Sequence, residues 1–151
     1  MTDHRIHEDA FNLLCGEKLG SGSFRDVFLC AVDHSLVVKV EHGSREEDWR
    51  QFHNFREWLF WESEYEKSVR KWLAPCIKLS PDGRLLLQKR VEPLRPHEYP
   101  KKLPAFMTDL RINNLGWFEG RVVACDYAYT TQTSDSTLKN VKWDSSQRGS
   151  K

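Results

Sequence analysis

Three short runs of apolar residues occupy the first part of the chain, at residues 13–19, 27–32 and 36–41. A glycine- and serine-containing segment separates the first two runs, and Asp33-His34 separates the second from the third. Apolar runs of this length between turn-forming residues are typical of β-strands. The pattern predicts a strand-loop-strand-turn-strand unit.

Residues 46–72 follow without proline or glycine. Apolar side chains recur there at steps of three and four residues, at Trp49, Phe52, Phe55 and Leu59. This spacing places them on one face of an α-helix. We expect one long helix, or a helix with a break, that ends at Ala74-Pro75.

Two further apolar runs, residues 76–79 and 84–91, flank the turn-forming segment 80–83. Proline, aspartate and glycine in that segment favour a tight reversal, so the two runs predict a hairpin. The first 91 residues therefore predict an α+β fold with a five-stranded antiparallel sheet and one long helix. Residues 92–104 are rich in proline and charge, which indicates an extended connection. The segment 129–151 is a polar extension that we expect to be partly mobile.

Length and charge narrow the classes of function. A chain of 151 residues fits one domain, and its 23 Lys and Arg residues nearly balance 22 Asp and Glu residues. This balance argues against a partner that is a nucleic acid or an anionic membrane. No apolar run is long enough to cross a bilayer. We expect a soluble, cytoplasmic protein.

Four cysteines lie far apart in the sequence and form no C-x-x-C pair, at Cys15, Cys30, Cys76 and Cys125. The spacing signals neither a zinc site nor a disulfide framework. We interpret them as reduced thiols in the core.

The loop Gly20-Ser21-Gly22-Ser23-Phe24 is the first element with a chemical use. Without side chains at Gly20 and Gly22, backbone N–H groups can approach phosphate oxygens, and Phe24 could close over a nucleotide. Arg25 follows, and its guanidinium could touch a phosphate. A simple hairpin turn is the alternative interpretation.

Lys39 lies in a strand of valines, where an ammonium group is costly to bury unless an anion neutralises it. A triphosphate or a carboxylate of the long helix would do so. We choose Glu57 as the helix partner and keep Glu62 in reserve, while Glu64 and Glu66 also lie on the predicted helix. The alternative is a solvated lysine at a sheet edge.

A third set of candidates lies further along the chain. Asp109 and Asn114 share the spacing D-L-x-x-x-N, and an apolar run at residues 122–125 leads into Asp126. Asp109 could act as a base or an orienting carboxylate for a hydroxyl group. Asn114 and Asp126 offer hard oxygen ligands for magnesium. Alternatively, Asn114 belongs to a plain turn and Asp126 caps a strand end.

Taken in order, these elements resemble the protein-kinase-like superfamily, and most closely the short kinase-like proteins of bacteriophages. The segments that carry the closer resemblance are residues 103–109, 114–117 and 120–123. The resemblance implies one kinase-like domain over residues 1–128, with an N-lobe at about 11–91 and a reduced C-lobe at about 92–128. It implies ATP and Mg²⁺ as cofactors.

The resemblance also implies an adenine-binding linker after the fifth strand. Gln88 would be the gatekeeper, and backbone groups of Lys89 and Val91 would bind adenine. Lys39, Glu57 and Asp109 would form the catalytic set.

The chain departs from the kinase pattern at several points. Arg25 replaces the usual third glycine, Met107-Thr108 replaces His-Arg before Asp109, and Tyr127-Ala128 replaces Phe-Gly. Only residues 92–108 separate the linker from Asp109, so there is no room for a full helical C-lobe. A peptide-binding platform and a regulated activation loop are therefore absent or supplied by another molecule.

Three kinds of function follow. The favoured one is a minimal phosphotransferase that moves the γ-phosphoryl group of ATP to a hydroxyl, on a protein or a small molecule. The second is a pseudokinase or interaction protein of phage origin that occupies a host protein, with or without nucleotide. The third is a structural or interaction protein in which the motif matches are accidental. The acceptor and the oligomeric state are left open.

Overall fold

The computed structural model describes residues 4–43, 48–63, 67–129 and 135–143. The chain forms an α+β fold of two compact units. The first unit comprises Met1–Trp58 and Cys76–Arg90, and the second comprises Leu59–Pro75 and Val91–Lys151. The kinase-like domain expected over residues 1–128 stays a prediction.

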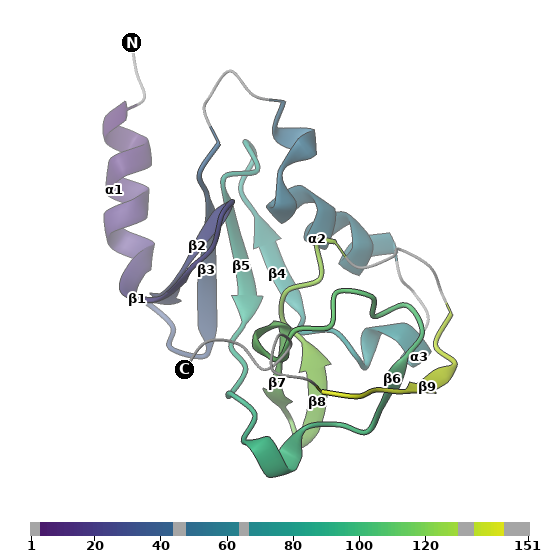
Figure 1. The fold of residues 1–151 in the computed structure, drawn as a ribbon. Helices are drawn as coiled ribbons and strands as arrows, with labels where there is room; N and C mark the ends of the chain where they lie inside the picture. The colour runs from purple at the N-terminus through teal and green to yellow at the C-terminus, as the bar shows by residue number, and fades with distance from the viewer. Residues whose placement is uncertain (1–3, 44–47, 64–66, 130–134, 144–151) are drawn as a thin grey trace. The chain divides into compact units, whose positions relative to one another are not determined.

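The first unit is built on a five-stranded antiparallel sheet with the strand order β1-β2-β3-β5-β4 (Figure 1). Its strands are β1 (Cys15–Ser21), β2 (Arg25–Cys30), β3 (Leu36–Glu41), β4 (Cys76–Leu79) and β5 (Leu85–Lys89). The expected five-stranded antiparallel sheet is therefore confirmed, and β3 and β4 have the predicted bounds.

An N-terminal helix, α1 (His4–Leu14), precedes the sheet. The prediction of a strand from residue 13 was wrong, because the chain is still helical there and the strand begins at Cys15. Phe11 of α1 packs edge-on against Phe28 of β2, with ring centroids 5.3 Å apart. This contact places α1 against the sheet face on which Phe28 lies.

The two faces of the sheet differ in character. Cys30, Leu36 and Val38 form a buried apolar cluster on the α1 side. Because side chains alternate along a strand, Lys39 lies on the opposite face. The start of helix α2 (His53–Ser63) contacts that second face, since Glu57 bonds to Lys39 there.

Of the two forms expected for residues 46–72, the helix with a break is the one found in the described residues, and the single continuous helix is wrong. The described part contains a 3₁₀ turn, η1 (Trp49–Gln51), then α2, and then the short helix α3 (Lys67–Arg70). Asp48 caps η1 by accepting a hydrogen bond from the Arg50 N–H, and Phe52 is extended with φ −66° and ψ 147°. Phe52 therefore separates η1 from α2. Residues 44–47 and 64–66 lie outside the described residues.

The prediction of four reduced thiols in the core is correct in part. All four cysteines are free, but only Cys30 and Cys76 are buried. Cys15 lies opposite Cys30 in the β1–β2 register and is half-buried, because β1 is an edge strand. Cys125 is also half-buried.

The second unit contains two antiparallel two-stranded sheets, one formed by β6 and β9 and the other by β7 and β8. Its elements in the described residues are α3, η2 (Pro96–Glu98), β6 (Lys102–Pro104), η3 (Ile112–Asn114), β7 (Leu115–Phe118), β8 (Arg121–Ala124) and β9 (Leu138–Asn140). Phe60 is buried in this unit, and its ring packs edge-on against the rings of Phe106 and Tyr127, with centroids 5.9 Å apart in each case.

Part of the polar extension is structured. The strand β9 lies inside the segment 129–151 and pairs with β6. The last residues of that segment, 144–151, were expected to be mobile and lie outside the described residues. None of the described helices is long and apolar enough to span a membrane.

Candidate functional site

The glycine loop joins β1 to β2. A methyl group on Gly20 would meet no atom within 4 Å, and one on Gly22 would meet only the Arg25 carbonyl oxygen at 3.5 Å. Neither residue has a positive φ. The fold itself therefore does not require glycine at these positions, and the absent side chains leave the backbone open to a ligand.

Side chains on either side of the loop hold its ends together. Ser21 Oγ donates to Asp26 Oδ1 at 2.6 Å, and His42 Nε2 lies 3.0 Å from the same oxygen. The second ring nitrogen of His42 lies 3.3 Å from the Ser23 carbonyl oxygen. The hydrogen bond from Ser21, and then that from His42, lower the pKa of Asp26 to about 2. Sequence reasoning did not identify Asp26 or His42, because their contacts depend on the register of β2 and β3.

Phe24, at the tip of the loop, stacks on His53 with ring centroids 4.4 Å apart and an interplanar angle of 25°. The ring is still 52% exposed. Its expected closure over a nucleotide stays a prediction.

Lys39 and Glu57 form a buried ion pair. The Lys39 Nζ lies 3.0 Å from Glu57 Oε1 and 2.9 Å from Oε2. Lys39 is 4% exposed and Glu57 is fully buried. The reserve candidate Glu62 is exposed, and Glu64 and Glu66 lie outside the described residues.

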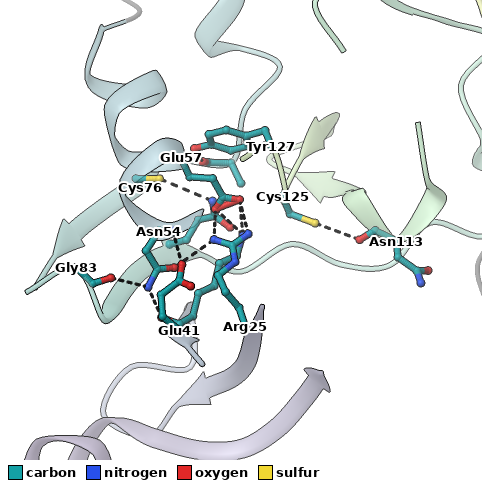
Figure 2. Close-up of polar contacts among 12 residues, drawn as sticks. Arg25, Glu41, Asn54, Glu57, Cys76, Gly83, Asn113, Cys125 and Tyr127 are labelled. Carbon is teal, nitrogen blue, oxygen red and sulfur yellow. Dashed lines mark hydrogen bonds and ion pairs between the residues drawn. The ribbon is translucent and has the colours of Figure 1, made fainter. Parts of the chain in front are cut away.

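Arg25 shares the same carboxylate. Its Nη1 donates to Glu57 Oε2 and its Nη2 donates to Oε1, each at 2.9 Å, in a two-pronged contact. The guanidinium points at Glu57 in Figure 2 and is 7% exposed. In this structure Arg25 is thus a partner of Glu57, and not the phosphate contact considered from the sequence. Burial by itself would raise the pKa of Glu57, but Arg25 and then Lys39 outweigh it and lower the pKa to about 2.

Asn54 ties this group to the sheet. Its Oδ1 accepts a hydrogen bond from Arg25 Nη1, and its Nδ2 donates to the Lys39 carbonyl oxygen at 3.0 Å. The Asn54 N–H donates to the Glu41 carboxylate at 2.7 Å, which satisfies a backbone donor in the first turn of α2 (Figure 2). Burial raises the pKa of Glu41. The start of α2 is therefore fixed to β2 and β3 by buried polar contacts.

The cross-strand neighbours of Lys39 are apolar. Val27 lies opposite Lys39 in the β2–β3 register, and Leu86 lies opposite Lys39 in the β3–β5 register. Val37, two residues before Lys39, lies on the same face, because side chains alternate along β3. The Lys39 ammonium group is thus buried next to apolar side chains, where its attraction to an anion is strong.

Gln88 lies on that face and is fully buried. Its Nε2 lies 3.8 Å from Cys76 Sγ, and its Oε1 has no hydrogen-bond partner among the described residues. Lys89 follows at the end of β5, opposite Leu36. Val91 belongs to the second unit, where it lies against Gly116. The adenine contacts expected of these linker residues stay predictions.

In the second unit, η3 places Asp109 and Asn114 near each other. Asn114 Nδ2 donates to the Asp109 carbonyl oxygen at 3.1 Å, which directs the amide oxygen Oδ1 away from that contact. The Asp109 carboxylate is 33% exposed, and Arg111 Nε lies 3.9 Å from it.

The β7–β8 hairpin brings Asn114 and Asp126 together, because one precedes β7 and the other follows β8. The Asn114 carbonyl oxygen accepts hydrogen bonds from the Cys125 N–H at 2.7 Å and the Asp126 N–H at 3.4 Å. Tyr127 anchors the next position, since its buried hydroxyl donates to the Ala74 carbonyl oxygen at 2.9 Å (Figure 2).

This pair fits magnesium in its donor types. An amide oxygen and a carboxylate are hard ligands, and magnesium commonly takes only one or two protein carboxylates and completes its shell with water and phosphate. No group of three or more His, Cys, Asp or Glu side chains that could hold a metal ion occurs in the described parts of the chain. The donor set therefore suits a cation that arrives with a phosphate ligand better than a structural metal.

The structure therefore brings the candidates together in two sets. Lys39 and Glu57 meet in the first unit, together with Arg25, which sequence reasoning did not link to them. Asp109, Asn114 and Asp126 gather in the second unit. No protein-family model matches the chain, and no curated protein matches it.

Proposed function

We propose that this chain is a minimal kinase-like phosphotransferase, related to the short kinase-like proteins of bacteriophages, which transfers the γ-phosphoryl group of ATP to a hydroxyl. The observation that carries the proposal is the buried ion pair of Lys39 and Glu57. Buried ion pairs contribute little net stability, so such a pair points to a ligand that uses it.

Each candidate has a role in this reaction. Lys39 binds phosphate oxygens, and the backbone of the glycine loop approaches them at Gly20 and Gly22. Asn114 and Asp126 hold magnesium, which neutralises charge on the phosphates when bound. Asp109 accepts the proton of the attacking hydroxyl or orients that hydroxyl.

Calorimetry of ATP binding with and without Mg²⁺ tests the nucleotide site. We expect binding that requires Mg²⁺ and that falls in Lys39→Ala and in Asp126→Asn. Lys78→Ala and Asp9→Asn are matched controls, because Lys78 and Asp9 are exposed and lie outside both sets. Absence of binding at millimolar ATP would exclude the phosphotransferase.

Transfer is tested separately from binding. The γ-phosphoryl group of labelled ATP should move to an acceptor protein or to the chain itself, and this label should disappear in Asp109→Ala while ATP binding is retained. Label that persists unchanged in both Asp109→Ala and Asp126→Ala would contradict the proposal.

The second candidate function is a pseudokinase or interaction protein that occupies a host protein. It is favoured by Arg25, which stands where kinases carry a third loop glycine and is engaged by Glu57. The exposed apolar residues Leu19 and Phe24, at 44% and 52% exposure, give the loop a surface for protein contact. ATP binding without any transfer, with an intact Asp109, would select this alternative.

A further inference from the structure

Glu57 has two cationic partners in the first unit, although one would neutralise it. Arg25 and Lys39 each reach both carboxylate oxygens, at distances between 2.9 and 3.0 Å. All three side chains are at least nine-tenths buried. A buried carboxylate that loses its only counter-ion is strongly destabilising. A second cation removes that penalty when the first one leaves.

The two cations are held differently. Arg25 binds Glu57 with a planar fork and is held at a third point by Asn54 Oδ1. A guanidinium is always charged and suits this bidentate geometry, whereas a lysine ammonium is a point charge on a flexible stem. Arg25 is therefore the fixed partner, and Lys39 is the one that can move.

We infer that Arg25 is a positioning residue, which remains bound to Glu57 so that Lys39 can turn from that carboxylate to an anionic phosphate. The inference rests on the proposed function, because the anion is a nucleotide phosphate. It assigns a role to the residue that replaces the third loop glycine. The arginine holds α2 and Glu57 in place, and the lysine does the binding.

The first test needs no nucleotide. Arg25→Met and Lys39→Met each remove one cation and keep an unbranched side chain of similar volume. The carboxyl pKa of Glu57 is followed by carbon-13 NMR, and stability is followed by urea unfolding. We expect a higher Glu57 pKa and a lower unfolding midpoint in Arg25→Met than in Lys39→Met.

Failure to fold is also informative in this test. If Arg25→Met does not fold and Lys39→Met does, the asymmetry is upheld. Equal effects of the two changes, a larger effect of Lys39→Met, or the failure of both to fold would overturn the inference, because Lys39 would then be as necessary to Glu57 as Arg25.

The second test uses Mg²⁺-ATP binding by calorimetry. In Arg25→Met, a lysine that turns to phosphate leaves Glu57 unpaired, so binding should weaken at least about tenfold. Glu57→Gln in the same chain removes the carboxylate and should restore most of the affinity. Arg25→Lys, which keeps the charge but not the fork, should fall between the native chain and Arg25→Met.

Rescue by Glu57→Gln separates positioning from general structural damage, because a damaged loop would not recover when a second buried residue is changed. Unchanged binding in Arg25→Met, or no recovery in the double variant, would overturn the inference. If the native chain does not bind Mg²⁺-ATP, the proposed function fails, and the NMR and unfolding comparison still decides the role of Arg25.

Discussion

Replacing one glycine by alanine should have opposite consequences at two positions of this chain. At Gly20, the new methyl group meets no protein atom within 4 Å. At Gly116, it would lie 2.4 Å from Val91 Cγ2 and 2.8 Å from the Glu92 carbonyl oxygen. The first position has room for a side chain, and the second has none because the chain after β5 runs directly over β7.

These distances indicate how much each substitution should change the free energy of unfolding. Gly20→Ala should leave the free energy of unfolding within about 1 kcal/mol of the native value, with a small gain from the stiffer unfolded chain. Gly116→Ala overpacks the second unit against a backbone atom and should cost about 1–3 kcal/mol. If phosphate oxygens approach the backbone at Gly20, the methyl group removes a hydrogen bond to a charged group. Such a bond contributes about 1.5–3 kcal/mol, or about 10- to 150-fold in affinity for ATP.

Urea unfolding and calorimetry of Mg²⁺-ATP binding measure both effects on the same two variants. Gly20→Ala should unfold like the native chain and bind ATP weakly. Gly116→Ala should unfold at a lower urea concentration than both the native chain and Gly20→Ala. A Gly20→Ala variant that binds ATP within about twofold of the native chain would refute the reasoning, because the open backbone would then have no ligand.

Two further predictions concern residues that flank the candidate sites. Tyr127→Phe restores the kinase-like residue but leaves the Ala74 carbonyl without the Tyr127 hydroxyl, so unfolding should become easier by about 1–2 kcal/mol in a urea titration, with the exposed Tyr129→Phe as control. Asp26 has its pKa lowered from 3.8 to about 2 by Ser21 and His42, so its contribution to stability is present above about pH 4 and is lost as pH falls toward 2. Asp26→Asn should therefore reduce the pH dependence of the unfolding midpoint in that window, and an unchanged acid profile would contradict this assignment.

Local sequence patterns were sufficient to predict much of the secondary structure of the first unit. Strands β3 and β4 and the hairpin turn were predictable, because apolar runs and turn residues act over a few positions. The N-terminal helix was missed although Ile6, Ala10 and Leu14 recur at four-residue steps. This helical repeat is short, and the apolar pair Leu13-Leu14 is equally compatible with the start of a strand.

Contacts between residues far apart in the chain cannot be derived from the sequence pattern. The sequence offered several carboxylates on the predicted helix as partners of Lys39, and Glu57, the one chosen, is the carboxylate that Lys39 contacts in the structure. The position of Arg25 in a loop motif suggested a ligand contact, whereas strand register and burial turn its side chain to Glu57. Such contacts arise only when the sheet and α2 are assembled.

Burial of the three charged side chains Arg25, Lys39 and Glu57 is costly in free energy. Replacement of a buried ion cluster by apolar residues of similar volume is often neutral or stabilising, by about 1–4 kcal/mol. The triple variant Arg25→Met, Lys39→Met and Glu57→Leu keeps the volume of the group and removes its charges. It also removes the Arg25 donor from buried Asn54, which offsets about 1 kcal/mol of that gain.

We therefore expect the triple variant to unfold at urea concentrations equal to or above those of the native chain, and to lose ATP binding. Among the single variants, Glu57→Leu leaves the Arg25 and Lys39 cations buried without their carboxylate and should be less stable than the triple variant. This order of stabilities would mean that the fold tolerates the charges and does not need them. A triple variant that is far less stable than every single variant would instead make the cluster a structural element, and the ion pair would no longer support a nucleotide site.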